Sequence, residues 1–183
     1  MLNLIKNNPM SAGIRWCEDN STAAGSPAKG TRSFSVDNLS FKNADSTASN
    51  YGASPITAGN NSYTKYPFIA ITGSFNQILN ARFNHISGTV GAGITLIAAT
   101  TSGYATPSAS DASSTLTGIL TQTGSLSTGL GVIFSNTGPE TASATTLTAS
   151  GYSCYCPVQL KSTSSAGAGD VGLITWGIIF DEN

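Results

Sequence analysis

Hydrophobic and polar positions alternate in short runs along the second part of the chain. Leu79, Ala81 and Phe83 alternate with Asn80 and Arg82. A period of two residues is typical of a β-strand that turns one face toward a core. We therefore predict a half-buried strand that extends from Phe75 to Phe83.

Other apolar runs of strand length follow one another after Pro67, with Gly, Ser and Thr between them. The predicted strands are Phe68–Ile71, Ile94–Ala98, Leu116–Leu120, Leu130–Phe134, Ala144–Ala149, Tyr152–Leu160 and Leu173–Phe180. Short strands separated by frequent turns favour an all-β fold, and we expect an antiparallel β-sandwich with jelly-roll topology. The stretch Thr100–Ser114 is predicted to be a long loop.

The last predicted strand, Leu173–Phe180, is apolar at nearly every position. Alternate side chains of a strand point to opposite faces, so both faces of this one are apolar. We expect it to lie in the middle of a sheet or at an edge that another subunit covers.

Residues 1–66 have a different pattern, being polar and interrupted by Pro and Gly. We interpret them as an extended N-terminal arm, and residues 67–183 as the β-sandwich domain. The arm contains six widely spaced aromatic residues: Trp16, Phe34, Phe41, Tyr51, Tyr63 and Tyr66. They could anchor the arm on neighbouring subunits, or they could fold back onto the sandwich of the same chain.

The composition limits the chemistry that is available. The 183 residues include 17 charged side chains and one histidine, against 49 serines and threonines and 20 glycines. Catalysis and metal binding depend on ionisable groups, whereas Thr suits strands and Ser and Gly suit turns. We expect a structural or binding protein that is not an enzyme and uses no cofactor.

The net charge is −1, which argues against binding to nucleic acid. Residues 1–83 contain seven Lys or Arg and four acids (+3), and residues 84–183 contain one Lys and five acids (−4). Such a division could steer one copy of the chain onto another, although sparse charges are also common on a solvated face.

Candidate reactive groups are few. His85 is the single histidine, and the adjacent acids Glu18-Asp19 and Asp181-Glu182 lie near the chain ends, where we expect them to be solvated. Cys17, Cys154 and Cys156 are odd in number, and we expect buried, reduced thiols. We predict no catalytic residue and no metal site.

The run Gly167-Ala168-Gly169-Asp170-Val171-Gly172 matches the Gly-x-Gly-x-x-Gly pattern of dinucleotide-binding turns. In that motif a helix follows the glycines and receives the pyrophosphate at its N-terminus. Here a strand-like run follows, so a hairpin loop is the better interpretation.

Two features bear on localisation. The first residues lack the basic region and continuous apolar stretch of a signal peptide, and Leu173–Phe180 is too short to span a bilayer. We expect a protein that is made in a cytoplasm and is not inserted into a membrane.

In its polar N-terminal segment and its Ser-, Thr- and Gly-rich β-domain, the chain resembles the capsid decoration or cement proteins of tailed bacteriophages. The runs that support this resemblance are Phe75–Phe83 and the final Thr175–Asn183. The resemblance implies a virion protein on the outside of the capsid, with an arm that clamps adjacent capsomers. Its partners would be the major capsid protein or other virion proteins and copies of itself, as in a trimer.

An alternative is a tail or baseplate component, or a module that binds host glycans through the Thr100–Ser114 loop and exposed aromatic residues. If the chain is a decoration protein with a clamping arm, removal of residues 1–66 should abolish attachment to the shell and leave the sandwich folded.

Overall fold

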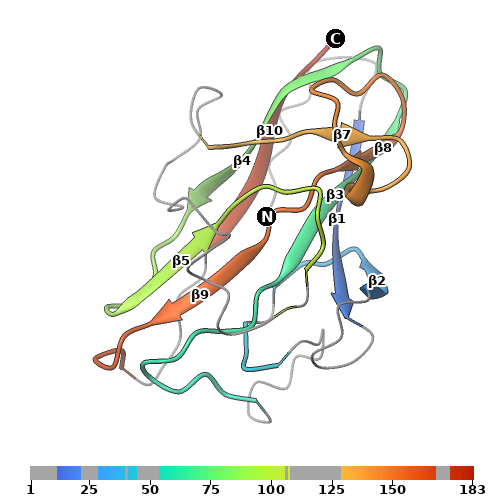
Figure 1. The fold of residues 1–183 in the computed structure, drawn as a ribbon. Helices are drawn as coiled ribbons and strands as arrows, with labels where there is room; N and C mark the ends of the chain where they lie inside the picture. Colours follow the sequence, from blue (N-terminus) through green and yellow to red (C-terminus); the bar gives the residue numbers. More distant parts are fainter. Residues whose placement is uncertain are drawn as a thin grey trace.

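The computed structural model describes residues 12–21, 29–39, 41–44, 54–105, 107, 129–167 and 174–183. These residues form antiparallel strands, which confirms the all-β prediction (Figure 1). The helical element within them is one short 3-10 turn, η3 (Pro139–Thr141). No helix in the described parts is long and apolar enough to cross a membrane.

The largest sheet has five strands. Their order is β2 (Lys29–Phe34), β1 (Ala12–Ser21), β3 (Tyr66–Gly73), β8 (Gly151–Ser153) and β7 (Phe134–Ser135). The longest pairing joins β1 to β3 in continuous antiparallel register from Ala12↔Gly73 to Asp19↔Tyr66.

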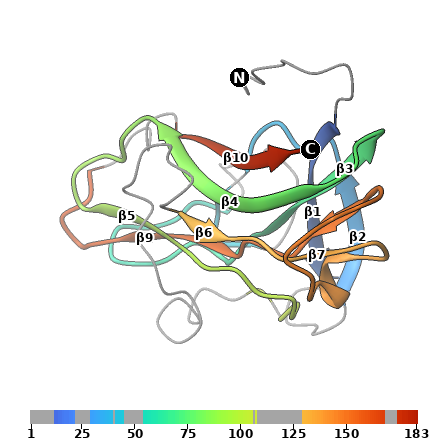
Figure 2. The same ribbon diagram turned by 90° about the horizontal axis from the view of Figure 1, so that it is seen from above.

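Two smaller sheets complete the fold. One has the order β10 (Thr175–Glu182), β4 (Ile78–Ser87) and β6 (Leu130–Gly131), and the other pairs β5 (Ile94–Ala98) with β9 (Val158–Ser162). Both views show β4 beside β10, and β5 beside β9 (Figures 1 and 2).

One main hydrophobic core is shared by all three sheets. Ile69 and Ile71 of β3, Phe83 of β4 and Leu160 of β9 are at most 2% exposed and belong to the same cluster. This shared core accounts for the apolar alternation in the sequence. The order of strands does not establish a jelly-roll path, so that topology is not confirmed.

A second, aromatic cluster lies on the opposite face of the five-stranded sheet. It contains the buried residues Cys17, Tyr66, Phe68, Ala70 and Tyr155. Cys17 and Phe68 are register partners, and so present their side chains on the same face. β1 and β3 are therefore packed on both faces.

The predicted separation at residue 66 is not confirmed. β3 begins at Tyr66, and β1 lies inside the sheet between β2 and β3. Two strands of the largest sheet thus come from the segment that the sequence pattern assigned to an extended arm. β1 is buried within the sheet because Trp16 and Cys17 pack into the two hydrophobic clusters and because Glu18 and Asp19 form ion pairs with cations of the same chain.

Most of the other predicted strands are present. β3 and β5 include Phe68–Ile71 and Ile94–Ala98, while Tyr152–Leu160 is divided between β8 and β9. The prediction for Ala144–Ala149 is wrong, because this segment forms only isolated bridges, with Phe134 and Ile78. Leu116–Leu120 lies outside the described residues.

The last strand, β10, is an edge of its sheet within the described residues, with β4 as its neighbour. Its side chains are partly buried at most positions and contribute to the main core from Trp176, Ile178 and Phe180. Coverage of this edge by another subunit remains a prediction.

Removal of residues 1–66 should prevent folding, contrary to the sequence-based expectation. The shortened chain lacks β1 and β2, so one edge of β3 loses its pairing and both hydrophobic clusters lose the side chains that β1 contributes. We expect fragment 67–183 to show no cooperative transition in urea and no near-ultraviolet circular dichroism. A cooperative transition like that of the full chain would instead support an independent domain.

Candidate functional site

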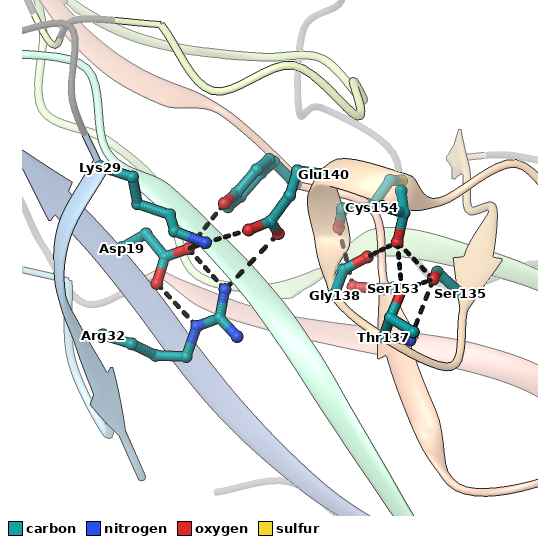
Figure 3. A network of polar contacts seen from close by, with 11 residues as sticks. Asp19, Lys29, Arg32, Ser135, Thr137, Gly138, Glu140, Ser153 and Cys154 are labelled. Atoms are coloured by element: carbon teal, nitrogen blue, oxygen red, sulfur yellow. Dashed lines mark hydrogen bonds and ion pairs between the residues drawn. The ribbon is translucent and has the colours of Figure 1, made fainter.

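A polar network centred on Asp19 is the densest group of charged side chains in the described structure (Figure 3). Asp19 of β1 and Arg32 of β2 are cross-strand partners. Arg32 donates from Nε to Oδ1 and from Nη2 to Oδ2, both at 2.9 Å. The Asp19 side chain is 0% exposed and that of Arg32 is 20% exposed, so the carboxylate of this bidentate pair is shielded from water.

Tyr155 completes the shell of donors around Asp19. Its hydroxyl donates to Oδ2 at 2.6 Å, and the Lys29 Nζ lies 3.9 Å from the same oxygen. Tyr155 is fully buried. Burial, and then the hydrogen bond to Asp19, raise the pKa of Tyr155 far above its ordinary value, so the phenol remains a donor.

Glu140 joins the network from η3, where it follows Pro139 in the first turn. It accepts a hydrogen bond from Lys29, and its Oε2 lies 3.6 Å from Arg32 Nη2. Burial acts to raise the pKa of Glu140, but hydrogen bonds from Lys29 and from a backbone N–H, together with the charges of Lys29 and Arg32, outweigh it and hold that pKa below its ordinary value. Two carboxylates thus face two cations, and the network is electrically balanced.

Arg32 also contacts aromatic rings. Its guanidinium carbon lies 4.6 Å from the ring centroid of Phe68 and 5.6 Å from that of Tyr152. Cation–π attraction of this kind adds about 0.5–2 kcal/mol, more where the cation is shielded from water. Arg32 therefore joins the charged network to the aromatic cluster.

A group of hydroxyls lies beside the network on the loop that leads into η3 (Figure 3). Ser135, Thr137 and Thr141 are linked pairwise at 2.6–3.1 Å, and Thr141 Oγ1 donates to the Gly138 carbonyl at 3.0 Å. These bonds close the loop upon itself and hold Glu140 toward β2.

The arrangement is suited to holding segments together. The pKa of Arg32 is raised by its hydrogen bond to Asp19, so Arg32, Tyr155 and Glu140 all keep their charge state near neutral pH. Burial raises the pKa of Cys17, Cys154 and Cys156, which keeps these free cysteines in the thiol form. No group of three or more His, Cys, Asp or Glu in the described residues could hold a metal ion.

The six aromatic residues that sequence analysis selected have different environments. Trp16 packs against the main core with its ring 5.6 Å from that of Phe83, and Tyr66 is buried in the aromatic cluster. Phe41 also packs on the main core, and Tyr63 is half-buried. For Trp16, Phe41 and Tyr66 the contacts fit the interpretation in which the residues fold back onto their own chain.

Phe34 differs, with 53% of its surface exposed at the edge strand β2. Tyr51 lies outside the described residues. The proposed role of the six aromatic residues as anchors on a partner remains a prediction.

The acidic pair Glu18-Asp19 corrects another expectation. Both residues were expected to be solvated near the chain end, yet they are 2% and 1% exposed. Cross-strand cations account for this difference, because each buried carboxylate has its own cation: Arg32 for Asp19 and Lys65 for Glu18. His85 lies half-buried in β4 opposite Trp176, and its Nδ1 has no hydrogen-bond partner.

Sequence reasoning did not select Asp19, Arg32, Glu140 or Tyr155 as a group. They come from four separate segments, so no local spacing connects them. The available signal was weaker: two adjacent acids next to an Ile-Arg-Trp-Cys run that alternates like a strand.

Replacement of Asp19 by Ala should destabilise the fold by about 3–5 kcal/mol, because Arg32 loses its bidentate partner and keeps only the 3.6 Å contact with Glu140, while the buried Tyr155 hydroxyl loses its acceptor. The measurement is the free energy of unfolding in urea. Asp37→Ala serves as the control, since Asp37 is exposed, and should change stability by no more than about 0.5 kcal/mol. Equal effects of the two substitutions would contradict a structural role for the network.

Glu140 should make stability depend on acid pH. Its folded pKa lies below the ordinary value of 4.5, so its stabilising contribution is complete above that value and is lost as the pH falls through the folded pKa. The difference in unfolding free energy between the native chain and Glu140→Gln should therefore shrink in acid. A difference that stays constant from neutral to strongly acidic pH would contradict the ion pairing of Glu140.

Comparison with known proteins gives no family assignment: no family model, curated protein or solved structure matches this chain.

Proposed function

We propose that the chain is a non-enzymatic structural protein of a virion, a capsid decoration or cement protein that stabilises the joints between capsomers. In this proposal its fold is a β-sandwich, its partners are the major capsid protein and other copies of itself, and it uses no cofactor. Support comes from the composition and from the way in which the described charges are used.

The charged residues of the site contact one another. Asp19, Arg32, Lys29 and Glu140 form a balanced group that connects β1, β2 and η3, and Glu18 and Lys65 form a second buried pair. Groups that are committed to internal pairs contribute to stability and are poorly placed to act on a substrate. This use of charge favours a structural role.

The observation that best supports the proposal is the exposed edge at β2. Among the described strands, β2 pairs on one side with β1, and Phe34 at its end is the most exposed large hydrophobic side chain. An open strand edge can pair with a strand of another protein, and an exposed aromatic residue can occupy a pocket there. The β2 edge is therefore the surface that we assign to the capsid.

Stabilisation would follow from the area that the chain covers. Burial of apolar surface is worth roughly 25 cal/mol per Å². If one copy contacts two capsomers, the capsomers cannot separate without exposing that apolar surface to water again. The bound protein therefore stabilises the assembly. Many copies, each with a modest contact, would then reinforce the whole shell.

The proposal is tested on purified virus particles. Quantitative mass spectrometry measures the number of copies of the chain per particle, and a gold-labelled antibody shows where they lie. We expect copies comparable in number to the capsid subunits, with label over the shell. A handful of copies at the tail would favour the alternative, a tail, baseplate or glycan-binding component. Absence of the chain from particles would contradict any virion role.

A substitution locates the contact surface. Phe34→Ser should weaken binding of the purified chain to shells that lack it, with little change in unfolding temperature, because Phe34 is exposed. Ile86→Ser is the matched control, since Ile86 is 40% exposed but lies in β4 of a different sheet. Equal binding by both variants would exclude Phe34 from the contact.

A further inference from the structure

A second buried polar group lies on the face of β1 opposite Asp19. Lys65 Nζ lies 3.1 Å from Glu18 Oε1, with side chains that are 0% and 3% exposed. Asn20, two residues after Glu18 in β1, is 7% exposed. The polar network around Asp19 uses none of these three residues.

Strand register places Asn20 next to Lys65. The pairing of β1 with β3 ends at Asp19↔Tyr66, and the next residues along the two antiparallel chains are Asn20 and Lys65. Side chains at opposite positions share a face, with Cβ atoms about 5 Å apart. Side chains alternate along a strand, so Glu18 and Asn20 share that face as well.

The bulge in this region does not disturb the alternation of β1. Asp19 pairs with Arg32 and Ser21 with Lys29, so β2 advances three residues while β1 advances two. The extra residue therefore belongs to β2. An amine, a carboxamide and a carboxylate are thus placed together in a site that excludes water.

We propose that Lys65 and Asn20 form an intramolecular isopeptide bond, with Glu18 as the proton carrier. A proton passes from the Lys65 ammonium to the Glu18 carboxylate, and the neutral amine attacks Asn20 Cγ. A bond forms between Nζ and Cγ, and the bond between Cγ and Nδ2 breaks. Of the three ammonium protons, one stays on the new amide, one stays on Glu18 and one passes through Glu18 to Nδ2, which leaves as ammonia.

The reaction needs no oxidant, cofactor or second protein, and Glu18 ends as a neutral carboxylic acid, so no unpaired charge is left in the buried site. It is a single event in each chain and is independent of the proposed role on the capsid. Amide exchange is slow in water, but groups that a fold holds side by side gain the large advantage of an intramolecular reaction.

The backbone of Lys65 is fixed before any reaction occurs. Lys65 N donates to the Val158 carbonyl at 2.8 Å, and Val158 N donates to the Lys65 carbonyl at 2.9 Å. Asn20 is held within β1. Both reacting residues are therefore ordered by the fold, so the bond should form after folding and join β1 to the chain immediately before β3.

The decisive measurement is the intact mass of the purified, denatured full-length chain. We expect a mass lower than that of the sequence by one ammonia. Digestion should then yield a branched peptide that contains Asn20 and Lys65, and fragmentation should locate the bond. A chain of full mass, or a branch between other residues, would overturn the proposal.

Variants test the role of each group. Lys65→Arg and Asn20→Ala should retain the full mass because they lack the nucleophile and the carboxamide, and Glu18→Gln should retain it because the proton carrier is absent. Lys42→Arg is the matched control: Lys42 is also a buried lysine, at 2% exposure, and this variant should still lose ammonia. Loss of ammonia in Lys65→Arg would overturn the proposal, and its loss in Glu18→Gln would overturn the role of Glu18. The mass of the native chain decides the central claim even if a variant fails to fold.

Discussion

The pairing of β1 with β3 is the constraint on which the rest of the structure depends. It extends without interruption from Ala12↔Gly73 to Asp19↔Tyr66 and brings the start of the described chain into the middle of the largest sheet. One face of this pair carries Trp16 and Ile69 into the main core, and the other carries Cys17 and Phe68 into the aromatic cluster. Both clusters require β1 to be in place.

The same strand holds two adjacent carboxylates in opposite environments. Asp19 lies among Arg32, Lys29 and Tyr155, whereas Glu18 lies against Lys65 on the core face. Removal of such charges from water is costly, and their partners offset this cost through good geometry. The ion pairs therefore specify how β1 sits between its neighbours, in addition to any net stability that they add.

Several elements could be predicted from the sequence because their physical signal is local. β5 coincides with its predicted range, and β3 and β4 overlap theirs, because short apolar or alternating runs between turns are local signals of buried strands. β1 escaped detection because Glu18, Asp19 and Asn20 made it look like solvated chain. A buried ion pair has no periodic signature, since its partner can be anywhere in the sequence.

The polar network illustrates the same limit. Asp19 and Glu140 are far apart in the sequence, and only the folded chain shows that Lys29 and Arg32 serve both. The aromatic residues of the N-terminal segment were recognised as significant, but spacing alone could not separate Tyr66, which is buried, from Phe34, which is exposed. Such distinctions depend on strand order, which the pattern of a single sequence leaves open.

The two-faced packing of β1 has a consequence for how this chain can vary over evolutionary time. Neighbouring residues of β1 point alternately into the main core and into the aromatic cluster. The gain or loss of a single residue there would turn each following side chain to the other face and place Asp19 among aliphatic side chains. Replacement of one residue disturbs the packing on one face of β1, whereas an insertion or deletion disturbs the packing on both faces. Homologues should therefore differ in residue identity along β1 much more readily than in its length.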